Sequence, residues 1–169
     1  MRTLTAKNHA DFAVIAYRVQ TAVNEARFLF REEDEWKGRD GGYFCLADAE
    51  TGLPYLVTLI GSVSGDKAEK YCAFAQEKAR RLASRPDHVS SWQSRNPKKE
   101  KYGGAIRYWG FIHSFSGFSE LGDEALMLLA SYYATPTAIR VSFIDVVVAL
   151  SSNPYWKPLS GFMHKHSIA

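Results

Sequence analysis

Apolar side chains recur at three- and four-residue steps in four stretches of the chain, the spacing that places them on one face of a helix. The helices predicted from this spacing cover residues 9–31, 66–84, 121–133 and 139–150. Four shorter runs are rich in β-branched and aromatic residues, which is typical of strands. These runs are residues 43–49, 53–63, 105–109 and 111–115. The β-branched run 146–148 leaves a strand as the alternative for part of the last helix.

The connections between the predicted elements indicate how the strands pair. Glu50-Thr51-Gly52 and the region of Gly110 each separate two predicted strands by a hairpin-length turn. Residues 85–102 lack periodicity and predict a long exposed loop, and the tail after residue 153 is aromatic but unpatterned. We therefore expect an α+β fold in which helices cover an antiparallel sheet. The organisation predicted for this fold is a single domain, 1–169, with a core at 9–134 and a C-terminal extension at 135–169.

The composition narrows the class of protein. Hydrophobic residues make up 46% of the chain and charged residues 23%, as in ordinary globular proteins. No stretch reaches about 18 apolar residues, and the N-terminus lacks the apolar segment of a signal peptide. These absences predict a cytoplasmic protein with no membrane partner. Cys45 and Cys72 have no metal-ligand spacing and are expected to be reduced core residues, with a disulfide or a reactive thiol as the alternative.

The formal net charge of +3 hides a basic segment between residues 80 and 101. Seven basic residues stand there against two acidic ones. Such a segment attracts anions, although a solvated helix end and loop would have the same composition. Trp92 lies among these cations, and an aromatic ring that can stack on a base beside basic residues is typical of single-stranded nucleic-acid sites. No established nucleic-acid-binding motif accompanies it. Nucleic acid is therefore an unfavoured partner.

Five short motifs follow one another in an order found in a known family. They are Leu46-Ala47-Asp48-Ala49-Glu50-Thr51-Gly52, the Ala- and Lys-rich segment 73–83, Gly103-Gly104-Ala105-Ile106, Ser114-Phe115-Ser116-Gly117 and Asp123-Glu124-Ala125. In these motifs the chain resembles, over about residues 9–130, the GlcG/HbpS-type family of haem-binding and related proteins. The resemblance implies a profilin-like sandwich and a ligand that is haem or another tetrapyrrole. The chain departs from the family pattern in having no proline after Gly104 and in carrying Phe115 and Phe118 where small residues are expected.

The segment 114–119 is the predicted centre of a ligand site. It precedes a predicted helix, so its hydroxyl and free backbone N–H groups gather at the positive end of the helix dipole. The predicted ligand-binding residues are His113, Ser114, Ser116, Gly117, Ser119, Lys98 and Lys101. The two lysines belong to the basic segment and would neutralise acidic groups of the ligand. Helix capping alone is the alternative role for the serines.

Two histidines, His113 and His9, are the candidate metal-binding residues and axial ligands for haem. His113 lies among apolar neighbours in a predicted strand, next to the Ser/Gly turn. A histidine that is simply accommodated within the sheet is the alternative reading of this position. Tyr102 and Tyr108 are further candidates, because a phenolate oxygen can also bind haem iron.

Acidic residues offer a weaker alternative for a metal site. Glu120, Asp123 and Glu124 lie at the start of the predicted helix 121–133, but nothing nearby in sequence completes the oxygen shell that a hard cation needs. They are therefore expected to be solvated acids of the first helical turn. Asp48 is expected to be a residue of a hairpin turn. No motif for nucleophilic catalysis occurs in the chain.

Together with the resemblance, these residues predict a small-ligand-binding protein in which no catalytic site is recognised. Its aromatic helices are expected to assemble it into a homo-oligomer. The alternative is a protein–protein interaction or scaffold module that offers a helix or a sheet edge to a partner. An enzyme of unfamiliar chemistry is the third hypothesis.

Overall fold

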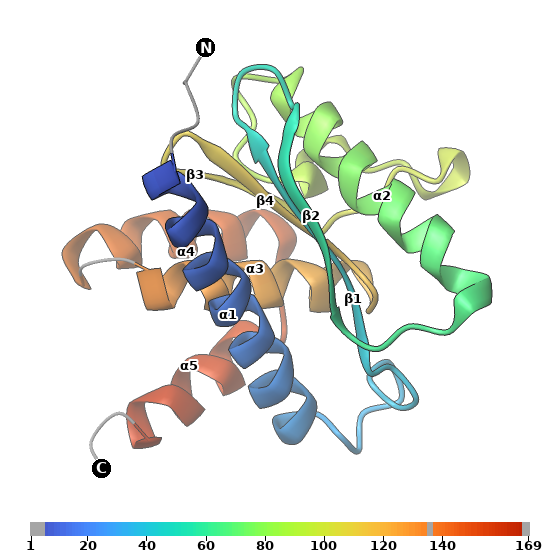
Figure 1. The fold of residues 1–169 in the computed structure, drawn as a ribbon. Helices are drawn as coiled ribbons and strands as arrows, with labels where there is room; N and C mark the ends of the chain where they lie inside the picture. Colours follow the sequence, from blue (N-terminus) through green and yellow to red (C-terminus); the bar gives the residue numbers. More distant parts are fainter. Residues whose placement is uncertain (1–5, 135–136, 167–169) are drawn as a thin grey trace.

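Four antiparallel strands form one sheet at the centre of the protein (Figure 1). The computed structural model describes the backbone of residues 6–134 and 137–166, and the side chains of residues 11–134 and 142–163. The strands are ordered β2 (Pro54–Gly61), β1 (Gly41–Asp48), β4 (Phe111–Ser116) and β3 (Ala105–Tyr108). Both predicted hairpins are present, and the pairing of β1 with β4 joins them.

Helices cover both faces of the sheet, so the fold has three layers (Figure 1). On one face lies α2 (Gly65–Ala83), which contacts β1 and β4. On the other face α1 (Ala6–Leu29) contacts β2, and α3 (Glu120–Ala134) contacts β3 and β4. The same side holds α4 (Thr137–Ser151) and α5 (Trp156–His166). This arrangement confirms the predicted α+β class and the helical C-terminal extension.

Alternate strand residues divide between two apolar cores, because successive side chains of a strand point to opposite faces. The α2 side is built mainly from small residues, which let the helix approach the sheet closely. This core includes Cys45, Ala47, Ala75, Ala79, Leu82 and Ile112. The larger core on the other face includes Val19, Phe44, Leu46, Phe115, Leu126 and Leu129. Both faces of the sheet are thus buried against helices.

The two cysteines are free thiols, as predicted, but only Cys45 is a buried core residue. Burial raises the pKa of the Cys45 thiol to about 12. Cys72 is half-buried on α2. No helix in the described part of the chain has the length and apolar character needed to span a membrane.

Asp48 fixes the turn between β1 and β2. Its Oδ1 accepts hydrogen bonds from the backbone N–H groups of Glu50 at 3.0 Å and Thr51 at 2.8 Å. Its Oδ2 accepts one from the Tyr55 hydroxyl at 2.8 Å. These bonds, the Thr51 N–H foremost, lower the pKa of Asp48 to about 2. With Gly52 at φ +70°, the turn is as predicted.

Residues 85–102 form a largely exposed connection, as the sequence predicted, but one with regular turns and a buried part. They contain two short 3₁₀ turns, η1 (Ser91–Ser94) and η2 (Pro97–Lys99), and Ser90 and Ser91 are fully buried. Ser90 begins η1 with a capping box, a local start signal that carries no hydrophobic periodicity. The backbone N–H of Arg107 donates to the Val89 carbonyl at 2.8 Å, so this segment also lies along the outer edge of β3.

The tail that appeared unpatterned forms α5, and the β-branched run 146–148 is helical within α4. Pro158 and Gly161 weaken the helical signal of α5 in the sequence. Leu159 and Met163 nevertheless bury one side of this helix in the larger core. Tertiary packing therefore stabilises a helix that local propensity does not favour.

Glu124 connects the C-terminal extension to the core. Its side chain is fully buried on α3 and accepts hydrogen bonds from Ser90 Oγ at 2.7 Å, Asn153 Nδ2 at 3.1 Å and Ser151 Oγ. Burial raises the pKa of Glu124, and the three donors act in the opposite direction. The expectation that Glu124 is a solvated acid is wrong, because the 3₁₀ segment and the residues after α4 enclose it.

We predict that Glu124→Ala lowers the free energy of unfolding by about 2–4 kcal/mol, because three buried donors lose their acceptor. Urea unfolding followed by circular dichroism measures this change. Glu124→Gln, which keeps an acceptor, should cost about 1 kcal/mol, and the exposed control Glu33→Ala less than about 0.5 kcal/mol. Equal stabilities of Glu124→Ala and the control would contradict the role assigned to this network.

Candidate functional site

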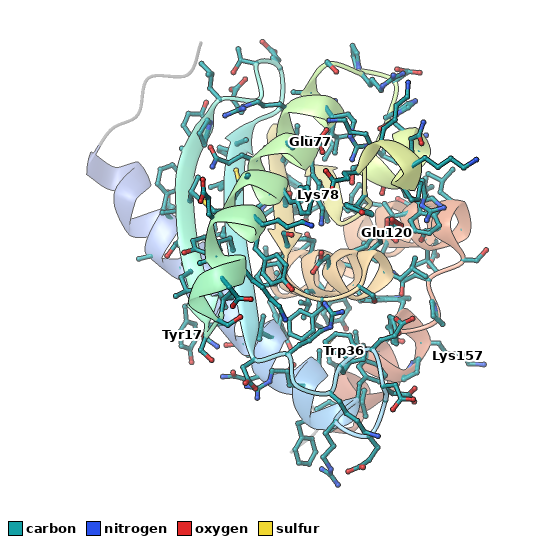
Figure 2. All side chains as sticks on the ribbon, turned by 90° about the vertical axis from the view of Figure 1, so that its right-hand side faces the viewer. Tyr17, Trp36, Glu77, Lys78, Glu120 and Lys157 are labelled. Carbon is teal, nitrogen blue, oxygen red and sulfur yellow. The ribbon has the colours of Figure 1, made fainter. Side chains whose placement is uncertain are left out.

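A cleft of about 360 Å³ opens between α2 and the segment that links β4 to α3. Figure 2 faces this side of the molecule and shows Lys78 on α2 and Glu120 at the start of α3. The lining residues are Lys70, Tyr71, Phe74 and Lys78 of α2, Tyr102, and Ser116, Phe118, Ser119, Glu120 and Asp123. The two sides of the cleft thus belong to different layers of the sandwich.

A buried ion pair forms the floor of the cleft. Lys78 Nζ lies 2.8 Å from Asp123 Oδ2, and the two side chains are 2% and 3% exposed. Lys78 also donates to the Phe115 carbonyl at 2.8 Å. Asp123 Oδ1 accepts the backbone N–H groups of Gly117 at 3.2 Å and Phe118 at 2.9 Å. Each charged group therefore has the additional hydrogen bonds that a buried ion pair requires.

Burial raises the pKa of Asp123 to about 6, while Lys78 and the two N–H donors act to lower it. The carboxyl group is ionised above that pH. At neutral pH the floor of the cleft consequently carries a positive and a negative charge side by side, with no net charge.

Gly104 makes room for the ion pair. Its φ is +109°, and a Cβ at this position would lie 2.6 Å from Asp123 Cβ and 2.9 Å from Lys78 Nζ. No other residue type fits both the backbone conformation and the space. The second glycine of the Gly103-Gly104 doublet is thus explained by the charged groups that pack against it.

The walls of the cleft are largely aromatic. Phe74 and Tyr102 meet edge to face, with ring centroids 5.4 Å apart, and Lys70 Nζ lies 5.3 Å from the centre of the Phe74 ring. The hydroxyl groups of Tyr71, Tyr102 and Ser116 have no hydrogen-bond partner among the described residues. They are the neutral polar groups that remain available at the cleft.

The charged side chains around the cleft are paired. Glu120 accepts a hydrogen bond from Arg95 Nε at 2.7 Å, and Lys70 Nζ lies 3.6 Å from Glu100 Oε1. Together with the Lys78–Asp123 pair, these contacts balance each lysine or acid of the lining with an opposite charge. The cleft therefore offers aromatic rings and neutral hydroxyl groups rather than a net electrostatic field.

The structure brings together only part of the predicted ligand site. Ser116 and Ser119 line the cleft, whereas the Gly117 N–H is already used by Asp123. Ser114 is buried and donates to the Ala75 carbonyl at 2.7 Å. Of the serines, Ser119 has the predicted capping role, since its Oγ accepts the N–H of Gly122 at 3.2 Å.

The two predicted lysines do not converge on the turn. Lys98 is exposed in η2, and Lys101 Nζ bonds to Glu77 Oε1 at 2.9 Å. Glu77 also receives Arg81 Nε at 3.0 Å. Three of the seven basic residues of the segment, Arg81, Arg95 and Lys101, are thus paired with acids, and two of them share Glu77.

His113 faces the other side of the sheet from Ser114 and Ser116, because strand residues alternate. Its imidazole is 8% exposed, and the rings of Phe44 and Tyr108 have centroids 6.1 and 6.0 Å from its own. Nδ1 has no hydrogen-bond partner among the side chains and backbone groups that the structure describes. Burial lowers the pKa of His113 to about 4, so the ring is neutral at pH 7.

This placement does not fit a haem held between His113 and the Ser114–Ser119 turn, because the sheet separates the two. The side chain of His9 lies outside the described residues. Tyr108 is buried beside His113, whereas Tyr102 is at the cleft.

The acids at the start of α3 do not form a metal site. Glu120 pairs with Arg95, Asp123 with Lys78, and Glu124 with hydroxyl and amide donors. Among the side chains that the structure describes, no group of three or more His, Cys, Asp and Glu residues could hold a metal ion. The expectation that Asp123 is solvated is wrong for the same reason as for Glu124: another element covers it.

Comparison with known proteins adds no further identification. No protein-family model, no curated protein and no solved structure matches this chain. The resemblance to the GlcG/HbpS-type family therefore stays a prediction, and the geometry of the cleft is the evidence on function.

The α2 side of the cleft is the part of the site that sequence reasoning missed, and Lys78 is its buried charged residue. A signal was present, since Tyr71, Ala75, Lys78 and Leu82 follow the four-three-four spacing of a single helix face. A lysine within such a row is a candidate for a buried charge that needs a partner.

We predict that Lys78→Met lowers the free energy of unfolding by about 3–5 kcal/mol, because it leaves the Asp123 carboxylate buried without its cation. Adding Asp123→Asn should recover at least about 1 kcal/mol, since the amide keeps an acceptor for Gly117 and Phe118 but has no charge. Urea unfolding measures both effects. The control Lys67→Met, at an exposed position of the same helix, should change stability by less than about 0.5 kcal/mol. A double variant no more stable than Lys78→Met would contradict the unpaired charge as the cause.

We predict a pH dependence of stability from His113. Its pKa of about 4 in the folded state is below the ordinary histidine value of 6.5, so below pH 6.5 the unfolded chain binds a proton that the folded chain does not. The contribution of His113 to stability is complete above about pH 6.5 and is lost as pH falls towards 4, by about 2 kcal/mol between pH 7.5 and 5. Urea unfolding measures the free energy of unfolding across this pH range. In His113→Phe its loss should be smaller by about 2 kcal/mol than in the unmodified protein. Parallel pH profiles of the two proteins would argue against a buried neutral imidazole.

Proposed function

We propose that this protein binds a small, uncharged, ring-containing molecule in the cleft between α2 and the β4–α3 segment. The observation that carries the proposal is an aromatic-walled cleft whose charged lining residues are paired, while three of its hydroxyl groups have no partner within the described part of the chain. This proposal keeps the small-ligand hypothesis of the sequence and gives it a different position and chemistry.

The size and walls of the cleft suit a ligand of one or two rings. A volume of about 360 Å³ lies at the lower end of the range for small-molecule sites, roughly 300–1,000 Å³. Phe74, Tyr102 and Phe118 contribute apolar ring surface, on which a flat ligand can stack or pack edge to face. A few polar groups then fix its orientation, as in most such sites.

The charge balance supports an uncharged ligand. A carboxylate would have to take Lys78 or Lys70 from an existing acidic partner, and an ammonium group would have to take Asp123 or Glu120 from a basic one. Exchange at the buried Lys78–Asp123 pair leaves a charged side chain unpaired inside the protein, which is costly, whereas the exposed Lys70–Glu100 pair is cheaper to exchange. A neutral carbonyl, amide or hydroxyl group can instead use the free hydroxyls of Tyr71, Tyr102 and Ser116.

The test is a binding series with benzamide, benzoate and benzylamine, three probes of similar size that differ in charge at pH 7. We predict that benzamide shifts the amide resonances of Phe74, Tyr102 and Ser116 in a ¹⁵N-correlated NMR titration. The charged probes should bind at least about 5-fold more weakly. Tyr102→Phe and Ser116→Ala should each weaken benzamide binding by about 3- to 10-fold, the value of one hydrogen bond.

Ser142→Ala is the matched control, because Ser142 is an exposed serine of α4 outside the cleft. Its affinity for benzamide should equal that of the unmodified protein. Stronger binding of benzoate or benzylamine would overturn the uncharged class of ligand. Shifts confined to other surfaces, or none up to millimolar benzamide, would overturn the cleft as the binding site.

A further inference from the structure

The outer edge of β2 is open, in contrast to the outer edge of β3. The segment before η1 pairs with β3 through the Arg107–Val89 hydrogen bond and an antiparallel bridge between Ser90 and Ile106. Within the described residues, β2 has a hydrogen-bonded strand on one side only, β1. An edge strand of this kind presents unpaired N–H and C=O groups that can pair with another chain.

The backbone groups on the open edge can be assigned from the pairing pattern. The Ser62 N–H donates to the Asp40 carbonyl, which makes these two residues a hydrogen-bonded pair of the antiparallel ladder. Hydrogen-bonded pairs occur at every second residue of such a ladder, so Thr58, four residues earlier, also directs its N–H and C=O groups toward β1. Val57 and Leu59 therefore direct their N–H and C=O groups outward. At the end of the strand, the Gly61 N–H already donates to Gln20 Oε1 of α1 at 3.2 Å.

The edge lacks the charges that usually protect an exposed strand. Residues 51–64, which comprise β2 and the turns beside it, contain no acidic residue and no lysine, arginine or histidine. Leu59 is 45% exposed on the edge. Protected edges typically carry a lysine or an inward-pointing charge that prevents association.

We infer that β2 pairs antiparallel with β2 of a second copy of this chain, across a two-fold axis at Thr58. This register places Val57 of each copy opposite Leu59 of the other as hydrogen-bonded pairs. The two Thr58 side chains then face each other at a non-hydrogen-bonded position. An uncharged strand is complementary to itself, because no like charges meet across the axis.

The neighbouring helix supports a second copy as the occupant. α1 runs in the same direction as β2, since Phe12 stacks near Tyr55 at the start of the strand and Gln20 bonds to Gly61 at its end. The two-fold axis that pairs the strands would therefore also bring the middle of α1 close to its symmetry mate. Tyr17, one turn before Gln20, is 73% exposed there, and Figure 2 shows it at the edge of the molecule. Burial of this ring on both copies would add apolar contact to the backbone pairing.

Sedimentation velocity at about 1–200 μM tests the inference, with a rise from one chain to two expected as concentration increases. Leu59→Lys should weaken association by at least about 10-fold, because two charges would be placed close to the axis. Leu53→Lys is the matched control, since Leu53 is 58% exposed but outside the paired residues. A monomer at every concentration, or equal effects of the two substitutions, would overturn the inference.

A cross-linking variant keeps the test decisive if Leu59→Lys does not fold. In a Cys72→Ser background, Thr58→Cys should form an intermolecular disulfide under mild oxidation, because facing residues at this position have Cα atoms about 4.5 Å apart. Thr51→Cys, at an exposed turn position of the same hairpin, is the control and should not cross-link. Dimers that cross-link no faster through residue 58 than through residue 51 would contradict the proposed axis.

Discussion

The Lys78–Asp123 ion pair is the contact on which the site depends, because it joins elements from opposite faces of the sheet. Lys78 comes from α2, Asp123 from α3, and the Phe115 carbonyl at the end of β4 lies between them. Gly104 must lack a side chain for the two charges to meet. Such a pair contributes little net stability compared with apolar residues of similar size, but it tolerates few alternative arrangements. Its effect is therefore to fix where the two layers close and where the cleft remains open.

The same pair determines the chemistry that the cleft can offer. A buried lysine or aspartate alone would attract an oppositely charged ligand, whereas here two of the three Lys78 N–H donors bond to Asp123 and the Phe115 carbonyl, and the two charges cancel. The outer pairs Arg95–Glu120 and Lys70–Glu100 extend this balance to the rim. What remains is the surface of Phe74 and its aromatic neighbours, with hydroxyl groups that cost little to desolvate when a ligand bonds to them.

The helices and strands could be predicted from the sequence because their apolar spacing is local, whereas the burial of polar groups could not. Asp123 and Glu124 have the composition of a solvated first helical turn, and it is Lys78, Ser90, Ser151 at the end of α4 and Asn153 after it that make them interior. Likewise the burial of Ser90 and the packing of α5 arise from contacts between distant segments. The spacing around Lys78 could be recognised in the sequence, but its partner Asp123 could not.

Coverage of both faces explains why the predicted site around His113 and Ser114 divides in two. In a sheet with one solvated face, polar residues of a strand share that face, and neighbouring polar positions indicate a common site. Here β4 is buried on both sides, so His113 and Ser114 point into different cores and each is accommodated separately. Helices over both faces also leave the edges as the only places where the sheet can gain a partner. Since the segment containing Val89 occupies one edge, the uncharged strand β2 is the position from which the sheet can grow.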